Sequence, residues 1–526
     1  MSLPVIKDDP SIIDPAINKA RRAYATLKTR PYEFRLAQLQ NFKKGVQTME
    51  KDICDAIQKD LGREAFVTWF AEVSVLISEI DHNIANLKNW MKDIFVDTPM
   101  TVGPATSKIV YEPLGCVLII GSWNYPIFTT LGPLVNAIAA GNVALIKPSE
   151  ISAFTSNVIK KLIVRHLDSN CYVPIEGQIE IAKALTSKKF DLICFTGSSE
   201  KGKLVAGSAA KNLTPCILEL GGKSPTVVDE SADLEYAAKK ICLGRFLNAG
   251  QTCIAPDFAL VHVSKISKFI ELMKKEIKTM FDDGKNVGQM GKVINDFHHN
   301  RLCALLENHG GNVAIGNGNA HLDKNLTPTL ILNPDRNSAV MKDEIFGPIL
   351  PIYTFQTIDE VIKTINDGEK PLALYYFGNQ SGTAYKRLER ETTAGMYVSN
   401  EALFQAMNCD LPFGGVGYSG YGRHHGYEGF KNFSNGKSVL NKQIMKMYPY
   451  SQLYPPFTPD KQRLMKSLIT YLNFSQATAA KRFFQLVIII LIARQVARGK
   501  INKVYINKVS QMLSTIIELL KIALYK

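Results

Sequence analysis

Short apolar runs rich in β-branched residues alternate with helical stretches through much of the chain, and this alternation constrains its fold more than any other feature. Five such runs occupy residues 117–120, 143–146, 192–195, 226–228 and 259–263. Strands that alternate with helices predict parallel sheets joined by crossover helices. The sequence therefore predicts an α/β protein.

A helical region precedes the first of these runs. Residues 14–97 are rich in Leu, Ile, Ala, Lys and Glu at helical spacing, for example at Leu39, Phe42 and Val46. At 526 residues the chain is too long for one simple core. Two α/β units after a helical opening are the simplest arrangement for this length.

The composition is that of a folded protein with a basic end. Hydrophobic residues make up 46% of the chain and charged residues 21%. Most of the formal net charge of +14 lies in residues 441–526, which contain 14 Lys or Arg against Asp460 and Glu518. The other residues show no basic stripe interleaved with aromatic side chains, so nucleic acid is not an expected partner. The nine cysteines lack a metal-type C-x-x-C spacing, so we expect free thiols, a reducing compartment and no metal site.

Two segments carry residues suited to covalent catalysis. Cys253 lies among small, turn-forming residues in segment 246–256, and Glu219 lies in segment 218–225, which leads into a glycine turn. A thiol can form a covalent intermediate, and a carboxylate can act as the accompanying general base. The pair predicts cysteine-based catalysis, whereas a buried structural thiol is the alternative that fits most of the other cysteines.

Glycines at a strand-to-helix turn indicate a phosphate site. Gly197, Ser198 and Gly202 follow the run at 192–195 and lead into a helix-like stretch. Backbone N–H groups at such a turn can approach a pyrophosphate at the positive end of the helix, although an ordinary turn has the same pattern. The G-x-G-x-x-G string at 415–420 lacks a preceding strand and a suitable acidic partner downstream, so we do not interpret it as a dinucleotide fingerprint.

Four segments taken together resemble the aldehyde dehydrogenase superfamily. They are the two segments around Cys253 and Glu219, Gly-Ser-Trp-Asn-Tyr-Pro at 121–126, and Pro-Phe-Gly-Gly at 412–415. The Cys253 segment and a later Tyr-Pro-Pro-Phe arm are similar to the class 3 branch, which includes fatty aldehyde dehydrogenases. The resemblance covers about residues 15–460 and implies two doubly wound parallel-sheet domains with a small oligomerisation element and a C-terminal helical tail.

The resemblance implies a role for each candidate in the reaction. Cys253 would form a thiohemiacetal and then a thioester, and the Asn124 amide with the Cys253 backbone N–H would hold the oxyanion. Glu219 would activate the water that hydrolyses the thioester. Glu344 would hold the nicotinamide ribose, and Phe346 would form an aromatic wall beside it.

The expected cofactor follows from the same resemblance. Lys147 and Glu150 resemble the family's adenosine ribose site. A carboxylate there would repel a 2′-phosphate, so NAD is expected over NADP, although NADP is possible.

The resemblance also implies domain boundaries and a homodimer. The NAD-binding domain would comprise residues 1–92 and 112–221, and the catalytic domain 222–410. Bridging and oligomerisation segments would lie at 93–111 and 411–440, followed by a proline-aromatic arm and a basic tail at 441–526.

The tail combines apolar stretches with basic flanks. Residues 483–493 form a largely apolar run too short to span a bilayer, and residues 509–524 have amphipathic spacing. Such segments suit an anionic membrane surface, whereas a C-terminal core or dimer helix is the alternative. Because the start of the chain lacks a secretory pattern, we expect a cytoplasmic catalytic body, with the tail on an intracellular membrane such as the endoplasmic reticulum.

The expected function is the NAD-dependent oxidation of medium-chain to long-chain aliphatic aldehydes to carboxylic acids. One alternative is a cysteine acyltransferase or a CoA-acylating dehydrogenase, in which a thiol replaces water. A further alternative is a non-enzymatic membrane scaffold that keeps only the fold. Glu219, as a base for water, favours hydrolysis.

Overall fold

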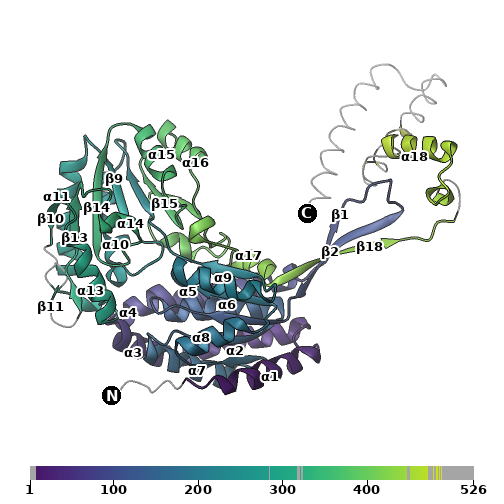
Figure 1. Ribbon diagram of the computed structural model, residues 1–526, viewed down its shortest axis with the longest axis horizontal. Helices are drawn as coiled ribbons and strands as arrows, with labels where there is room; N and C mark the ends of the chain where they lie inside the picture. The colour runs from purple at the N-terminus through teal and green to yellow at the C-terminus, as the bar shows by residue number, and fades with distance from the viewer. Residues whose placement is uncertain are drawn as a thin grey trace. The chain divides into compact units, whose positions relative to one another are not determined.

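The computed structural model describes residues 8–282, 285–316, 320–321, 324–446 and 450–471, together with 478, 481, 483, 485, 487 and 488. The chain forms two compact units. The larger comprises Met1–Lys92 and Tyr111–Gly436, and the smaller comprises Asp93–Val110 and Lys437–Lys526. The larger unit contains two separate sheets with their covering helices (Figure 1).

The first sheet of the larger unit has six strands. Their order is β17 (Gly420–Tyr421), β7 (Cys216–Glu219), β6 (Leu192–Thr196), β3 (Cys116–Ile120), β4 (Val143–Lys147) and β5 (Tyr172–Pro174). Neighbouring strands are parallel except β17, which pairs antiparallel with β7. Strands β3 and β4 are buried along their full length, as expected for a parallel sheet covered on both faces.

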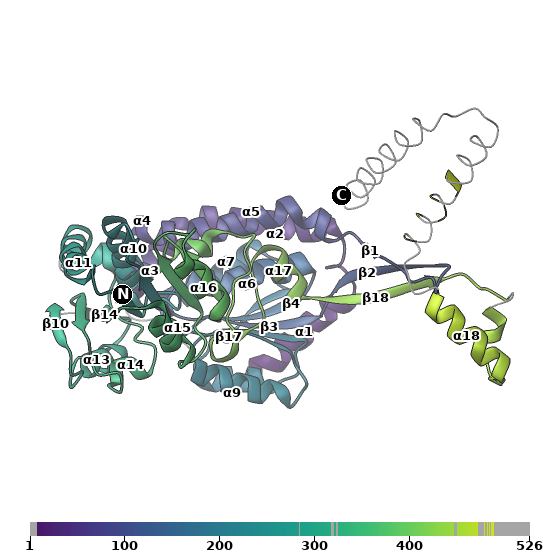
Figure 2. The same ribbon diagram turned by 90° about the horizontal axis from the view of Figure 1, so that it is seen from above.

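Helices cover both faces of this sheet. They are α1 (Ile13–Ala25), α2 (Tyr32–Thr48), α3 (Glu50–Leu61), α4 (Ala65–Thr68), α5 (Ser74–Trp90), α6 (Pro126–Ala140), α7 (Ala153–His166), α8 (Ile179–Ser187) and α9 (Ser199–Ala210). Figure 2 shows α6 and α7, with α2 and α5 beyond them, on one side of β3 and β4, and α1 and α9 on the other. A π-helical turn, Trp69–Val73, joins α4 to α5.

The second sheet of the larger unit has seven strands. Their order is β10 (Asn312–Ile315), β13 (Thr329–Leu332), β14 (Ile349–Phe355), β9 (Phe258–His262), β8 (Pro225–Val228), β15 (Ala373–Phe377) and β16 (Met396–Ser399). All neighbours are parallel except β10 with β13. Buried side chains such as Val227, Leu260 and Tyr376 form the core around its central strands.

The remaining elements of the larger unit surround the second sheet or follow it in the chain. They are α10 (Leu234–Phe246), α11 (Ile266–Phe281), α12 (Val287–Met290), α13 (Asp296–Leu305), β11 (Ala320–His321), β12 (Asn325–Leu326), α14 (Ala339–Lys342), α15 (Ile358–Asn366), α16 (Thr383–Glu391) and α17 (Gly426–Asn432). The predicted α/β class with parallel sheets is confirmed. Each of the five runs predicted as strands overlaps one of β3, β4, β6, β8 and β9.

The smaller unit contains β1 (Ile94–Val96) and most of β2 (Ala105–Pro113) and β18 (Ser434–Lys442), which form one three-stranded sheet in that order. It also contains α18 (Pro459–Tyr471). Within the described parts of the chain, no helix has both the length and the apolar character needed to cross a bilayer. The two apolar stretches at 483–493 and 509–524 lie outside the described residues, apart from 483, 485, 487 and 488.

Candidate active site

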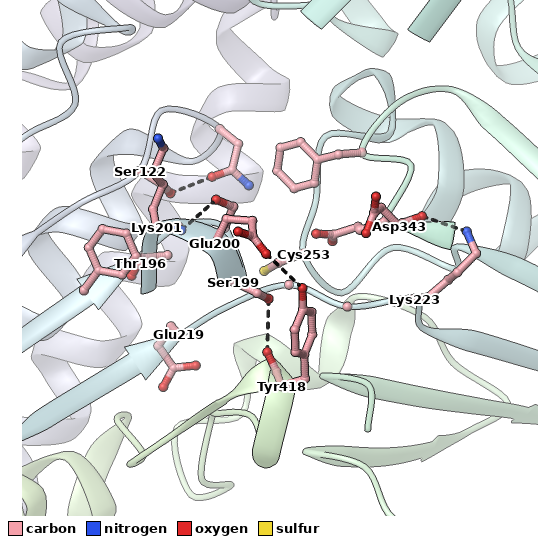
Figure 3. Close-up of a pocket in the computed structure, with 18 of the residues that line it drawn as sticks. Ser122, Thr196, Ser199, Glu200, Lys201, Glu219, Lys223, Cys253, Asp343 and Tyr418 are labelled. Carbon is pink, nitrogen blue, oxygen red and sulfur yellow. Dashed lines mark hydrogen bonds between the residues drawn. The ribbon is translucent and has the colours of Figure 1, made fainter. Parts of the chain in front are cut away.

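A cavity of about 1510 Å³ in the larger unit is lined by residues from both sheets. It includes the carboxyl ends of β3, β4, β6 and β7, where ligands bind in open parallel sheets. A single small ligand usually occupies roughly 300–1,000 Å³, so this cavity has room for a dinucleotide and a second molecule. Cys253, Glu219 and Asn124 all line it, and Figure 3 shows the Cys253 sulfur within it.

A buried turn of small residues carries the chain from α10 to Cys253. In the 3-10 turn Leu247–Gly250, Asn248 and Ala249 have φ of 57° and 52°, and Gly250 has φ of 71°. Three consecutive left-handed residues favour Asn and Gly. A Cβ on Gly250 would also overlap a neighbouring carbonyl. Asn248 and Gly250 therefore suit this turn, whereas Ala249 adopts a conformation that is uncommon for alanine.

Side-chain amides hold this turn against the loop that carries Asn124. Asn248 Nδ2 donates to the backbone oxygens of Asn124 at 2.9 Å and of Gln251 at 3.2 Å. Gln251 Nε2 donates to the Asn248 oxygen at 2.9 Å, and Gln251 Oε1 accepts from the Ile294 N–H at 3.0 Å. These buried bonds set the position of Cys253 relative to Asn124.

The Cys253 thiol is partly exposed to the cavity and otherwise surrounded by protein. Burial raises its pKa well above the usual thiol range, and the nearby carboxylates of Glu344 and Glu219 raise it further. The thiol form therefore predominates at neutral pH. Loss of its proton becomes easier when a positive group is near, because opposite charge favours the thiolate.

Asn124 lies in the loop between β3 and α6 and is almost fully buried. Its Oδ1 accepts from Ser122 Oγ at 2.6 Å, which fixes the amide orientation, and its Nδ2 donates to the Gln251 backbone oxygen at 2.9 Å. A primary amide carries two donor hydrogens, so one remains for a ligand in the cavity.

Glu219 is the last residue of β7, and its backbone pairs with Gly420 of β17. Its side chain is buried, and neither carboxylate oxygen has a hydrogen-bond partner in the described part of the chain. Burial raises the pKa of the Glu219 carboxyl well above its usual range, and the charge of Arg423 opposes this only in part. An unpaired buried carboxylate beside a cavity is suited to exchanging a proton with a ligand or water.

Glu344 also lines the cavity and follows α14 in the chain. It accepts from the Gly222 N–H, and a Cβ on Gly221 would overlap its carboxylate, so glycine is needed at that close approach. Burial, together with the Asp257 carboxylate, raises the pKa of Glu344 to about 8.

A buried cluster around Asp257 holds the segment that carries Glu344. Asp257 Oδ1 accepts from the Ile345 N–H and from Arg245 Nη1, both at 3.1 Å. Asp257 Oδ2 accepts from Lys223 Nζ at 2.7 Å, and Lys223 also donates to the Asp343 oxygen at 3.0 Å. Sequence reasoning gave no role to Lys223, Arg245 or Asp257, although Lys223 lies in the Glu219 segment and Asp257 directly follows the Cys253 segment.

Aromatic side chains form one wall of the cavity. The Trp123 ring lies edge-on to Phe346, 5.3 Å between centroids, and 5.0 Å from the His298 ring. Arg301, one turn beyond His298 on α13, donates to the Ile345 oxygen at 2.7 Å. Burial lowers the pKa of His298 to about 4, so this imidazole is neutral near pH 7. No motif marks His298 or Arg301 in the sequence.

The far end of the cavity can hold a dinucleotide. Lys147 is buried at the end of β4, and its Nζ lies 2.7 Å from Glu150 Oε2. Ser198 caps α9 by accepting from the Lys201 N–H at 3.4 Å, and Gly197 lines the same turn. Hydroxyl-binding side chains beside a helix N-terminus fit a ribose and a pyrophosphate. Gly202 lies inside α9, where it packs closely against Leu220.

Tyr418 is a cavity residue that sequence reasoning did not assign. Its backbone oxygen accepts from Ser199 Oγ at 3.0 Å, and both residues are labelled in Figure 3. The Tyr418 ring centre lies 4.7 Å from Lys203 Nζ. Tyr418 therefore holds the first turn of α9 against segment 417–421, which forms a 3-10 turn and β17.

No group of His, Cys, Asp and Glu in the described residues is arranged to hold a metal ion. All nine cysteines lie in the described part of the chain and are free. His424 and His425 are buried against Phe413 and Phe128, and burial lowers the pKa of His425 to about 3.

Residues from two largely parallel sheets line one large cavity, together with a thiol, a buried carboxylate and a helix N-terminus, and this arrangement is typical of α/β enzymes that bind a dinucleotide. The family model described as "Aldehyde dehydrogenase family" matches residues 5–439. The dimeric NADP-preferring aldehyde dehydrogenase of Rattus norvegicus is 38% identical over 85% of this chain and 98% of its own.

Other relatives give the same result. Aldehyde dehydrogenase family 3 member A2 of Pongo abelii is 39% identical over 85% of this chain and 91% of its own. The 4,4′-diaponeurosporen-aldehyde dehydrogenase of Staphylococcus aureus is 40% identical over 82% and 94%. A solved structure titled as the substrate-bound state of Staphylococcus aureus AldH superposes with a TM-score of 0.83 at 38% identity, over 87% of this chain and 99% of its own.

The chain belongs to the aldehyde dehydrogenase family. It is therefore an NAD(P)-dependent oxidoreductase that oxidises aldehydes. Residues 440–526 lie beyond the family match.

Proposed function

We propose that this protein oxidises medium-chain to long-chain aliphatic aldehydes to carboxylic acids through a thioester on Cys253. The observation that carries the proposal is the buried, unpaired carboxylate of Glu219, which lines the same cavity as the Cys253 thiol. Thioester hydrolysis requires a base that can take a proton from water, and an unpaired carboxylate of raised pKa is suited to that step.

In the first half of the reaction, the Cys253 thiol loses its proton to solvent water, the thiolate sulfur attacks the aldehyde carbon, and the carbonyl oxygen becomes an oxyanion. The free N–H of the Asn124 amide and the backbone N–H of Cys253 donate to that oxygen. NAD held by Glu344 and Phe346 would supply the hydride acceptor for oxidation of the thiohemiacetal on Cys253 to the thioester. The Ser122 hydroxyl keeps the Asn124 amide turned so that its nitrogen serves as the donor.

In the second half, Glu219 takes a proton from a water molecule, and the resulting hydroxide adds to the thioester carbon. The C–S bond then breaks, the carboxylic acid leaves, and the Cys253 thiolate is restored. A cysteine acyltransferase or a CoA-acylating enzyme would need an acceptor thiol in place of this water. The placement of a base beside the nucleophile supports hydrolysis.

The adenosine ribose hydroxyls would bond to Lys147 and Glu150. The pyrophosphate would lie at the start of α9, near Gly197, Ser198 and Gly202. The nicotinamide riboside would be held by Glu344 and Phe346. The first sheet with its helices would then bind the cofactor, and the second would carry the nucleophile. A homodimer is also proposed, since the rat relative is named as dimeric.

Replacing Glu150 with Gln is expected to shift cofactor selectivity toward NADP. The wild-type carboxylate would repel a 2′-phosphate, so its removal should raise the NADP-to-NAD ratio of kcat/KM by about tenfold or more. Parallel steady-state assays with the two cofactors measure this ratio. Glu271→Gln is the matched control, because Glu271 is an exposed residue of α11 that pairs with Lys268. An unchanged ratio would remove Glu150 from the ribose site.

The apolar surroundings of Cys253 support an aliphatic substrate. The cavity that contains the Cys253 thiol is also lined by apolar side chains, among them Trp123, Phe297 and Phe346. Apolar pockets take up alkyl chains because each buried CH₂ contributes about 0.8 kcal/mol. NADH formation with aldehydes of about two to eighteen carbons, with and without CoA, tests the function. A kcat/KM that does not rise with chain length contradicts the substrate class, and a CoA thioester product contradicts hydrolysis.

Deleting residues 461–526 is expected to abolish cosedimentation with anionic lipid vesicles. That segment contains 12 Lys or Arg between apolar stretches, and basic apolar segments bind anionic bilayers. Vesicles with and without phosphatidylserine, at low and high salt, measure the binding. The truncated protein should keep its kcat/KM with a short, water-soluble aldehyde. Equal sedimentation of both proteins would contradict the membrane role of the tail.

A further inference from the structure

A buried ion pair contacts the residues that directly follow Asn124 in the chain. Arg63 follows α3 and Glu72 lies in the π-helical turn between α4 and α5, and both side chains have no exposed surface. Arg63 Nη2 donates to Glu72 Oε1. The pair lies outside the cavity lining, so neither residue contacts a ligand there.

Glu72 caps α6 from a distance. Its Oε2 accepts from the Ile127 N–H at 2.8 Å and from the Phe128 N–H at 3.2 Å. These N–H groups belong to the first turn of α6, whose own N-cap residue, Tyr125, provides no side-chain cap. A helix N-terminus has unpaired donors and partial positive charge, so a carboxylate there stabilises its position. Glu72 therefore fixes the point where the Asn124 loop enters the helix.

Arg63 and Tyr125 extend the contact to the nucleophile segment. The Arg63 guanidinium lies 4.9 Å from the centre of the Tyr125 ring. The Tyr125 hydroxyl is 2.9 Å from Thr252 Oγ1, and Thr252 directly precedes Cys253. Burial raises the pKa of Tyr125 to about 12, so its hydroxyl keeps its proton and can donate this bond.

Two neighbouring residues before α6 thus contact the two residues before Cys253. Asn124 Nδ2 bonds the Gln251 oxygen at 2.9 Å, and Tyr125 bonds Thr252. A shift of the α6 terminus would move both contacts together. Displacement of a reacting group by about 1 Å can reduce a rate by about a hundredfold.

We propose that Arg63 and Glu72 are a positioning pair, which holds the Asn124 amide and the Tyr125–Thr252 contact in register with the Cys253 sulfur. The inference rests on the proposed roles of Cys253 and Asn124. It adds two residues from the helical N-terminal region that act through α6 and not on the substrate. We expect loss of the pair to slow formation of the thioester and to change the affinity for the aldehyde and for NAD only slightly.

Glu72→Gln tests the pair, because glutamine keeps the size of the side chain and removes its charge. The rate constant of the first NADH turnover should fall by about ten- to a hundredfold, with less than a threefold change in the aldehyde KM. Asp60→Asn is the matched control. Asp60 is also a buried carboxylate that caps a helix from a distance, accepting from the Thr155 N–H of α7 at 2.8 Å. This control should lower Tm while leaving the first-turnover rate within about twofold of wild type.

A double-mutant cycle with Asn124→Ala separates positioning from general destabilisation. If Glu72 acts through Asn124, Glu72→Gln should lower the first-turnover rate much less in the Asn124→Ala background than in the wild type. Additive effects in the cycle, or equal rate losses in Glu72→Gln and Asp60→Asn, would overturn the proposal.

If Glu72→Gln fails to fold, Tyr125→Phe tests the positioning proposal in its place. This variant removes only the hydroxyl bonded to Thr252 and leaves the ring against Arg63. It should lower the first-turnover rate by about three- to tenfold at unchanged KM, and a wild-type rate would overturn the proposal. Cys253→Ser, assayed in the same series, distinguishes failure of the proposed function from failure of the positioning pair. An active Cys253→Ser enzyme rejects the proposed function itself, whereas an inactive one with a wild-type Tyr125→Phe rate rejects only the positioning pair.

Discussion

Replacing Cys253 with Ser is expected to reduce kcat/KM for aldehyde oxidation by about four orders of magnitude or more. A hydroxyl is a far weaker nucleophile than a thiolate and forms no thioester, so both halves of the reaction lose their intermediate. The loss should lie in kcat, because the side chain that changes does not line the dinucleotide end of the cavity. NADH formation, in single-turnover and steady-state assays, measures the effect.

Two controls keep this result specific to Cys253. NAD binding, followed by protein fluorescence, should stay within about twofold of wild type. Cys303→Ser should have full activity, since Cys303 is also a partly exposed thiol but lies on α13 outside the cavity lining. A Cys253→Ser enzyme that retains its rate would show that another group attacks the aldehyde.

Replacing Glu219 with Gln is expected to separate the two halves of the reaction. The first turnover should still release about one NADH per site, because thioester formation does not need the Glu219 base. Steady-state turnover should fall by about 10²- to 10³-fold, the usual contribution of a general base. A rapid burst of NADH followed by a slow phase is the expected trace, and the absence of a burst would contradict the assignment.

The pH dependence gives a second readout of Glu219. Its raised pKa means that the carboxyl is protonated, and inactive as a base, below that pKa. Steady-state turnover of the wild type should therefore increase as pH rises through this raised pKa, and Glu219→Gln should lose this increase. The raised pKa of Cys253 gives a separate alkaline rise in the first-turnover rate, which Glu219→Gln should keep.

The parallel sheets were predictable because their central strands are buried on both faces. Runs such as residues 117–120 and 143–146 contain only apolar side chains, and the structure buries all of β3 and β4. The π-helical turn Trp69–Val73 was not predictable, because its residues have ordinary helical spacing. Glu72 lies in this turn, and its partners Arg63, Ile127 and Phe128 come close to it only in the folded protein.

The site was predictable where a short motif carries the chemistry. Cys253, Glu219 and Asn124 lie in local sequences that resemble one family, and the structure brings all three to one cavity. Their catalytic roles stay predictions until the variants are measured. Arg63 and Glu72 give no such signal, because single charged residues in a helical region are usually solvated.

Buried ion pairs between segments far apart in the chain are features of the site that the sequence did not predict. Asp257 joins Lys223, which lies 34 positions earlier, to the Glu344 segment far along the chain. Spacing along a helix or strand predicts neighbours only within that element, so no periodicity links these residues. Buried charges of this kind require their partners, but the sequence does not say which charges are buried.

The most direct test of the account is to trap the acyl group on Cys253. Glu219→Gln enzyme mixed with NAD and a long-chain aldehyde, quenched within the NADH burst, should gain the mass of one acyl chain in intact-protein mass spectrometry. Peptide mapping should place that mass on Cys253, and hydroxylamine should remove it as expected for a thioester. NADH release without any adduct, or an adduct on another cysteine, would contradict the central claim that this thiol carries the substrate through oxidation.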